Sequence, residues 1–323
     1  MITLLESKVG MADKVDQAVV DEFRRGSWLL DNISFDNTVS PGTGGSTLVY
    51  GYIRRKVPSV AQFRPINTEY TAQETIRERL SQELKIFGGK FELDRVIINT
   101  AGAVDELNDQ MTEKIKGAVN LFHYTVINGD SAVDPDQFDG LDVFITGSST
   151  EFNAGGAPID ISTSALMDAN YNEFLDMMTE FESGLDGRPD AFLVNTRLAT
   201  KIKGVARRAG YYTRAEDAFG RPVDTWSGIP IIDMMSFYDE SISATVPVVP
   251  IDTATGTTSL YAVIFGVNAF HAASPVGDRI ITTAFPDLSA PGVMKEGDVE
   301  MVTCVVLKNT LKAGAFREIK VTP

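Results

Sequence analysis

The sequence predicts an α+β fold with two domains, and three observations support that class. A basic, extended stretch at residues 46–70 leads into a predicted β-hairpin at residues 75–98. One long amphipathic helix follows over residues 102–127. From residue 148 onward, helix patterns alternate with strand patterns, which is typical of a sheet flanked by helices. We therefore expect a hairpin-and-helix domain with an α/β domain inserted before its C-terminal strands.

Length and composition are those of a folded protein that needs no cross-links. The 323 residues are 43% hydrophobic, which is enough for a core in each of two domains. The single cysteine, Cys304, lies in an apolar run, so we expect a buried thiol and neither a disulfide nor a cysteine-based metal site. No stretch predicts a membrane span or a signal peptide, so we expect synthesis in the cytoplasm.

Charge is unevenly distributed along the chain. The formal net charge of −15 argues against tight binding of nucleic acid by the protein as a whole. Residues 37–68 nevertheless contain no Asp or Glu and carry Arg54, Arg55, Lys56 and Arg64. A solvated loop is one interpretation. We favour a basic arm that lies across an acidic neighbouring subunit, because opposite potentials align two surfaces. The four side chains are therefore predicted to make contacts between subunits.

The first 45 residues predict an arm that needs a partner surface. A short amphipathic helix is expected over residues 12–23. The stretch that follows ends in the glycine-rich residues 41–45 and has too few apolar side chains to hold a core position alone.

Two extended segments and a hairpin are expected next. Residues 47–57 and 62–70 predict the strands of a long two-stranded ribbon. An isolated ribbon is marginally stable in water, so something outside it must hold it. The hairpin over residues 75–98 is expected to turn at Gly88 and Gly89.

The helix over residues 102–127 is the clearest single element. Acidic residues near its start interact favourably with the positive end of the helix dipole. Asn128 with Gly129 predicts where the helix stops. Its apolar residues recur every three or four positions in one stripe: Val104, Leu107, Met111, Ile115, Ala118, Val119, Phe122 and Val126.

The α/β region opens with a helix that Ser162 or Thr163 can cap, and a strand is predicted at residues 191–194. A basic helix over residues 197–209 ends at Gly210. Further strands are predicted at residues 229–233, 260–265, 280–284, 299–307 and 316–321.

The basic helix carries Arg207 and Arg208 beside its apolar face. A solvated or salt-bridging face is the default interpretation of such a pattern, and nucleic-acid binding is the alternative. We assign both arginines to a contact between subunits in the second domain.

The order of these segments resembles the HK97-type fold of the major capsid proteins of tailed bacteriophages. Residues 47–70 resemble its extended loop, the E-loop, and residues 102–127 resemble its spine helix. The exit from the helix is similar too, with Asn128-Gly129-Asp130 and then Phe138-Asp139-Gly140-Leu141. Later segments resemble strands of the axial and peripheral domains: residues 228–231, 261–266, 301–311 and 315–316.

This resemblance implies a division of the chain and a set of partners. Residues 1–45 would be the N-terminal arm, 46–70 the E-loop, 71–145 with 262–323 the peripheral domain, and 146–261 the axial domain. Copies would form pentamers and hexamers and close into an icosahedral shell, the capsid of a virion assembled in the host cytoplasm. The shell would enclose double-stranded DNA without sequence-specific binding. A portal and a separate scaffolding protein are implied, a decoration protein is compatible, and no membrane, cofactor or metal is expected.

Two alternatives stay open at this point. An encapsulin-like nanocompartment shell would share the fold, although the basic E-loop favours a virus. A soluble two-domain enzyme would need a catalytic constellation, and the sequence offers only His123 and His271 as bases near neutral pH. Both histidines fall in or beside apolar patterns, so structural roles are expected, and we predict that the chain is not an enzyme.

Overall fold

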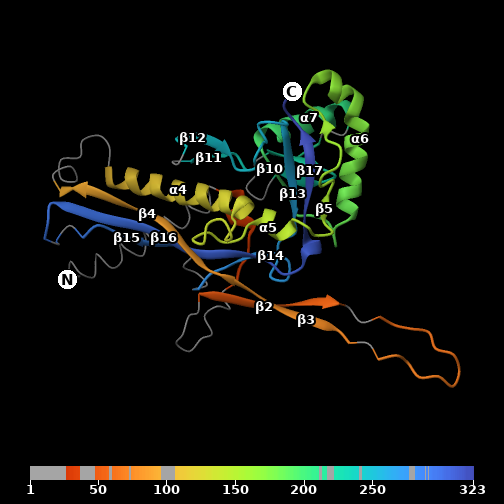
Figure 1. Cartoon of the computed structure of the whole chain (residues 1–323). Coiled ribbons are helices and arrows are strands. Elements are labelled where there is room, and N and C mark those ends of the chain that lie inside the picture. The colour runs from red at the N-terminus through yellow and green to blue at the C-terminus, as the bar shows by residue number, and fades with distance from the viewer. Residues whose placement is uncertain are drawn as a thin grey trace.

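The computed structural model describes residues 27–36, 48–57, 60–72, 74–95, 106–210, 213–216, 222–239, 242–275, 281–287, 289 and 291–323. The helix predicted over residues 12–23 lies outside this part of the chain. The described residues form two sheet-centred bodies and a ribbon that projects from their base (Figure 1). None of the described helices is long and apolar enough to cross a bilayer.

The first sheet is built around the long strand β16 (Met294–Leu307). The end of β16 pairs with β14 (Phe270–Ala273), and its first part lies between β15 (Ile281–Ala284) and β4 (Lys85–Asp94). The short strand β1 (Phe35–Asp36) adds to β14 in parallel.

The long helix α4 (Glu106–Asn128) covers one face of this sheet (Figure 1), and it confirms the predicted spine helix. At 1.5 Å per residue its 23 residues span roughly 34 Å. The described part of its apolar stripe, from Met111 to Val126, is buried in the first core. Gly129 and Gly140 close the helix exit, because the Gly140 amide donates to the Gly129 carbonyl at 2.7 Å.

Gly88 and Gly89 do not form a turn, and the predicted hairpin over residues 75–98 is therefore wrong. Both glycines lie within β4, opposite Glu300 and Val299 of β16. A Cβ atom on Gly88 would lie 1.9 Å from the carbonyl oxygen of Val299. The glycine is thus needed for close approach of two strands, and not for a reversal of the chain.

The ribbon also differs from the prediction. Its first strand, β2 (Val49–Val57), pairs antiparallel with β3 (Ile76–Glu83), and not with residues 62–70. Residues 62–70 lie instead in the loop that joins the two strands. After a break at Leu84, β3 continues into β4, so the ribbon is an extension of the first sheet's edge strand. We use "ribbon" below for β2, β3 and the loop between them.

The second sheet carries the inserted domain. Its strand order is β5 (Glu151–Phe152), β17 (Ala313–Lys320), β13 (Thr257–Val263), β7 (Ala191–Val194), β10 (Ile229–Asp233), β9 (Pro222–Trp226) and β8 (Thr213–Glu216), and β6 (Ile159–Asp160) also pairs with β17.

Both faces of the second sheet are buried at its central strand β7. On one face, Phe192 and Val194 of β7 pack with α6 (Ser164–Ser183) and α7 (Thr196–Ala209). On the other face, Ala191 and Leu193 join the core that contains α4. A strand buried on both faces is apolar at every position, which explains the unbroken run at residues 191–194.

Several local predictions in this domain are confirmed. Thr163 caps α6 by accepting a hydrogen bond from the Leu166 amide at 3.3 Å. Gly210 ends α7 with a left-handed φ of 74°. The strand at residues 229–233 forms where it was predicted. The last strand, β17, pairs in this second sheet, whereas the sequence analysis grouped residues 262–323 with the first domain.

Residues 27–36 pack against the chain's own first core, although they fall within the predicted arm. The short helix α2 (Trp28–Asn32) buries Leu29 and Leu30 there. On the other side of α4, the hairpin of β11 (Ser236–Asp239) and β12 (Ala244–Pro247) packs the Phe237 ring against Tyr124, with ring centroids 4.3 Å apart.

Candidate assembly interface

The ribbon projects from the base of the molecule and has two distinct faces (Figure 1). Because side chains alternate along a strand, Tyr50, Tyr52 and Arg54 share one face and Gly51, Ile53 and Arg55 share the other. The two tyrosines are buried, whereas Gly51, Ile53 and Arg55 are exposed. The first face is therefore the inner one, and the second is free to meet another molecule.

Arg54 is committed to its own chain. Its Nε donates to the carbonyl oxygen of Lys308 at 3.0 Å, and its Nη2 donates to that of Leu307 at 2.7 Å. These carbonyls lie at the end of β16, so the guanidinium fastens the ribbon to the first sheet. The sequence analysis assigned Arg54 to a contact between subunits, and these two bonds leave it little capacity for one.

A small buried polar cluster strengthens the same attachment. The Tyr50 hydroxyl donates to Asp36 Oδ2 at 2.6 Å and lies 3.2 Å from His271 Nε2. Lys308 Nζ lies 3.9 Å from Asp36 Oδ2 and sits over the Tyr50 ring. The cluster joins β1, β2, β14 and the end of β16, so the ribbon and residues 35–36 share one anchor.

The protonation state of His271 follows from this geometry. Since the Tyr50 proton goes to Asp36, Nε2 of His271 must donate to the Tyr50 oxygen. Its Nδ1 is buried without a hydrogen-bond partner among the described residues. Burial, aided by the positive charge of Lys308, lowers the pKa of His271 to about 4. The ring is neutral near pH 7 and acts as a structural group.

Arg54→Met is expected to loosen the base of the ribbon, because the carbonyls of Leu307 and Lys308 lose a charged donor. Hydrogen bonds to charged groups contribute about 1.5–3 kcal/mol, so amide exchange in β2 should accelerate by roughly tenfold or more. Hydrogen exchange followed by mass spectrometry would measure it. The control is Arg55→Met on the exposed face, and equal protection of β2 in the two variants would refute the anchor.

The outer face of the ribbon carries three exposed arginines. Arg55 of β2 lies directly opposite Arg77 of β3, and Arg79 follows two residues along the same face. None of the three has an ion-pair partner within the described part of the chain. Like charges placed directly opposite each other destabilise a strand pair. We call Arg55, Arg77 and Arg79 the arginine face.

Sequence analysis found only Arg55 of this set. Arg77 and Arg79 were missed because residues 75–86 were expected to pair within another hairpin. The signal was nevertheless present, since two arginines at alternate positions of a strand always share a face. Lys56 lies in β2, but its side chain is outside the described part of the structure.

The distal loop, residues 60–72, carries apolar side chains into solvent. Phe63 is fully exposed, Ile66 is 90% exposed, and Tyr70 is 62% exposed. Arg64 donates to the carbonyl of Thr68 at 3.0 Å and lies over the Tyr70 ring, which leaves part of its guanidinium open.

The two arginines predicted in the basic helix, Arg207 and Arg208, make different contacts. Arg208 pairs with Asp168 and donates to Ser164 Oγ at 2.8 Å, so it ties α7 to α6 within one chain. Arg207 is exposed and donates only a long hydrogen bond, 3.4 Å, to the Lys203 carbonyl. Of the two, only Arg207 remains available for a contact between subunits.

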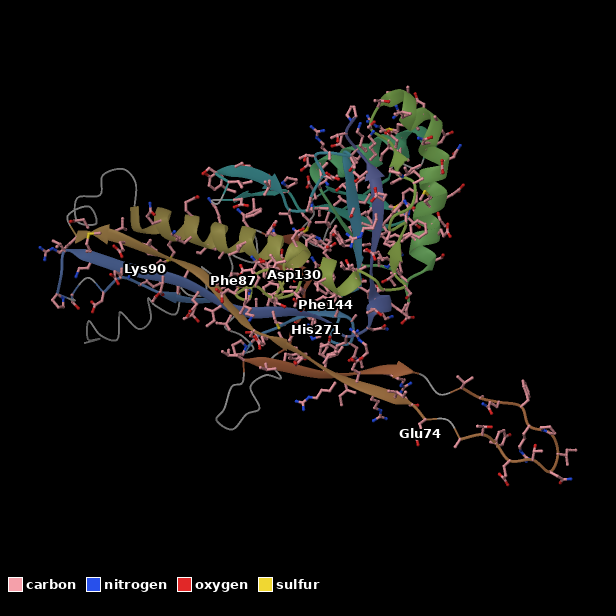
Figure 2. The ribbon with its side chains drawn as sticks, viewed as in Figure 1. Glu74, Phe87, Lys90, Asp130, Phe144 and His271 are labelled. Carbon is pink, nitrogen blue, oxygen red and sulfur yellow. The ribbon has the colours of Figure 1, made fainter. Side chains whose placement is uncertain are left out.

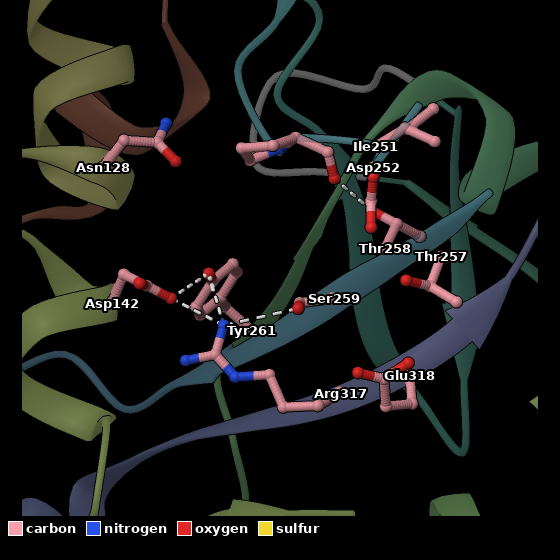
Figure 3. Close-up of a pocket in the computed structure, with 11 residues that line it drawn as sticks. Asn128, Asp142, Ile251, Asp252, Thr257, Thr258, Ser259, Tyr261, Arg317 and Glu318 are labelled. Carbon is pink, nitrogen blue, oxygen red and sulfur yellow. Dashed lines mark hydrogen bonds and ion pairs between the residues drawn. The ribbon is translucent and has the colours of Figure 1, made fainter. Parts of the chain in front are cut away.

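A polar pocket of about 300 Å³ lies between the second sheet and the helices α4 and α5 (Leu141–Ile145) (Figure 3). Arg317 of β17 pairs with Asp142 of α5 at 2.5 Å and with Glu151 at 3.1 Å. The Tyr261 hydroxyl donates to Asp142 at 2.7 Å, and burial raises the pKa of Tyr261. These polar groups satisfy one another, and the network joins α5 to the second sheet.

The other groups that could support chemistry are held in structural roles. His123 is hydrogen bonded to the side chain of Ser27, and burial lowers its pKa to about 4. Burial raises the pKa of the Cys304 thiol to about 12, so the thiol is inert near neutral pH.

The fold is that of proteins that build shells. The chain is similar to the holo-SrpI encapsulin complex from Synechococcus elongatus, with 14% identity, 92% of this chain and 88% of that chain covered, and a TM-score of 0.64. It is similar to a structure from Mycobacterium phage Bobi, with 12% identity, 90% of both chains and a TM-score of 0.58. It is also similar to the capsid of Myoviridae phage XM1, with 10% identity, 90% of both chains and a TM-score of 0.53.

The family is defined by a second comparison. The family model of the SU10 major capsid protein matches residues 62–228, more than half of the 323 residues. The chain therefore belongs to the SU10 major capsid protein family. It is a structural protein that assembles with copies of itself into the shell of a virion, and it is not an enzyme. No curated protein matches the sequence significantly.

Proposed function

We propose that the chain forms pentamers and hexamers that close into an icosahedral phage head around double-stranded DNA, and that each ribbon lies on a neighbouring subunit. The peripheral domain would comprise the first sheet with α4, and the axial domain the second sheet with α6 and α7. A portal, a separate scaffolding protein and, optionally, a decoration protein would join the growing shell during assembly in the host cytoplasm.

The exposed ribbon is the observation that carries this proposal. It projects away from both sheets (Figure 1), and its distal loop carries Phe63, Ile66 and Tyr70 in solvent. Two-stranded ribbons are marginally stable alone, and contiguous exposed apolar side chains mark interaction surfaces. The arginine face adds three cations, which have no ion-pair partner among the described residues, to the same element of an acidic protein. A neighbouring copy would bury the loop and neutralise these charges.

The encapsulin-like alternative has the same fold, and a likeness at 14% identity says nothing of what the shell encloses. A genome is favoured because the family match is to a major capsid protein. Purified shells from infected or induced cells would decide it: nuclease-protected DNA supports the phage head, and a protein cargo without DNA supports the nanocompartment.

Charge reversal of the ribbon tests the docking step. Arg77→Glu with Arg79→Glu should leave the subunit folded, since both side chains are exposed, but should prevent closed shells. Negative-stain electron microscopy and sedimentation velocity measure assembly, and urea unfolding checks the fold. The matched control is Arg77→Lys with Arg79→Lys, which keeps the charge. Normal shells from the reversed variant would refute ribbon docking by charge.

A further inference from the structure

Both histidines of the chain hold outlying segments on the first core. His123 of α4 is hydrogen bonded to the side chain of Ser27, at the start of α2. His271 of β14 is hydrogen bonded to Tyr50 of the ribbon, and Figure 2 shows it between the first sheet and the ribbon. We call these two contacts the histidine latch.

The latch holds both ends of one segment. Residues 27–36 begin at Ser27, which His123 contacts, and they end at Asp36, which accepts the Tyr50 hydroxyl proton at 2.6 Å. Because Tyr50 also contacts His271, the second histidine joins the end of the segment and the base of the ribbon in one cluster.

The surroundings of His271 favour a neutral ring. The side chain is fully buried, and the positive charge of Lys308 acts in the same direction as burial. Asp36 and the carbonyl of Ala269 favour a charged ring, but they do not outweigh these two effects. Cys304 of β16 adds no charge, because burial raises the pKa of its thiol to about 12.

A second proton on His271 has no good place in this cluster. Nε2 already donates to the Tyr50 oxygen, so the added proton would enter at Nδ1. That nitrogen is buried without a hydrogen-bond partner among the described residues. A buried charged donor without a well-placed acceptor is costly. The charged ring is therefore stable only when the cluster opens and water reaches it.

His123 depends on its neutral form for a different reason. Ser27 Oγ already accepts the amide proton of Leu30 at 3.2 Å. Ser27 is buried, so its own hydroxyl proton needs an acceptor, and Nε2 of His123 supplies one. Burial alone lowers the pKa of His123 to about 4. A protonated ring would withdraw this acceptor from the cap of α2.

Acid should therefore weaken both contacts. In an opened segment each ring returns to an ordinary pKa of about 6.5, whereas the closed latch keeps both pKa values near 4. Between these values the open state binds more protons than the closed state, so opening becomes easier as the pH falls. Near pH 7.5 the rings are neutral in both states and the latch keeps its full strength.

We propose that His123 and His271 form an acid-sensitive latch, closed at neutral pH and released by mild acid, that holds residues 27–36 and the base of the ribbon on the first core. This inference goes beyond the proposed function, because it concerns how one subunit holds its own segments. Arg54 stays charged at both pH values and keeps its two carbonyl contacts, so acid frees residues 27–36 more completely than the ribbon.

Hydrogen exchange of the full-length protein at about pH 7.5 and about pH 5.3 tests the latch. Each rate is divided by that of an unstructured peptide at the same pH, which removes the pH dependence of the exchange chemistry. Protection of α2 and β2 should fall about tenfold or more in acid, as the two pKa values require. Strand β7, buried on both faces, is the internal reference and should keep its protection.

Glutamine variants supply matched controls, because an amide can make the same hydrogen bond and does not titrate. In His271→Gln, β2 should lose its acid response while α2 keeps most of its own, and His123→Gln should show the reverse. A change of less than about twofold in the wild-type protein overturns the latch. So does an acid response of β2 in His271→Gln that equals that of the wild type.

A second measurement needs no variant, so it decides the matter even where a glutamine protein does not fold. Deuterium exchange at the ring C–H between the two nitrogens, followed by mass spectrometry, reports the midpoint of titration of each histidine in the native protein. Both midpoints should lie below about pH 5.3. An ordinary midpoint, about 6.5, at either ring removes that ring from the latch and overturns the proposal.

Discussion

Replacing Gly88 with alanine is expected to separate β4 from β16 and to destabilise the subunit by about 3 kcal/mol or more. The new Cβ would lie 1.9 Å from the Val299 carbonyl oxygen and 2.9 Å from Glu300 Cα. These are backbone atoms held in the sheet ladder, so they cannot move aside without breaking strand pairs. Soluble yield and urea unfolding at fixed subunit concentration measure the effect, because assembly itself adds stability by mass action.

The neighbouring glycine supplies the control. A Cβ on Gly89 would lie 3.1 Å from Cδ of Lys114, which is the flexible part of a long side chain. Gly89→Ala should therefore change stability by less than about 1 kcal/mol, and the lower entropy of the unfolded chain offsets part of that. If both alanine variants unfold at the same urea concentration, the close approach of β4 and β16 does not require glycine at position 88.

Removing the Arg317 guanidinium is expected to have the second large effect. Arg317→Met should lower the free energy of unfolding by about 3 kcal/mol. Its side chain is 15% exposed and that of Glu151 is 14% exposed, so an unpaired carboxylate would remain in a largely buried place. Breaking such a pair costs about 3–5 kcal/mol when it is fully buried, and Asp142, at 43% exposed, reduces the effect. Thermal or urea unfolding measures it.

Two further variants show whether the cost comes from uncompensated charge. Adding Glu151→Gln to Arg317→Met should recover part of the loss, because the stranded negative charge is removed. Lys116→Met breaks the exposed pair with Glu113 and should cost no more than about 1 kcal/mol. A loss in Arg317→Met as small as that in Lys116→Met would contradict a structural role for the network.

Elements governed by local chemistry were predicted from the sequence. The stripe of α4, the Thr163 cap of α6 and the left-handed Gly210 after α7 depend on residues within a few positions of one another. Periodicity and capping act over that range, so the sequence alone shows them. The order of these elements also carried the resemblance to the capsid fold.

Partner choice between distant strands was not predictable in the same way. Residues 62–70 had the composition of a strand, but β2 pairs with β3, and the glycines of β4 face β16 more than 200 residues later. Strand propensity indicates that a segment can form a strand, but it does not indicate which other strand it will pair with. For the same reason, the sequence analysis grouped β17 with the first domain, although its partner strands lie in the second sheet.

The candidate interface was also predictable only in part. The sequence located a basic, extended segment, because charge and composition are summed along the chain, and the order of its segments carried the resemblance to a family of shell proteins. Only the tertiary structure decided that Arg54 holds its own chain while Arg55, Arg77 and Arg79 share an exposed face. Which side of a strand a charge faces depends on register, and register is fixed by long-range packing.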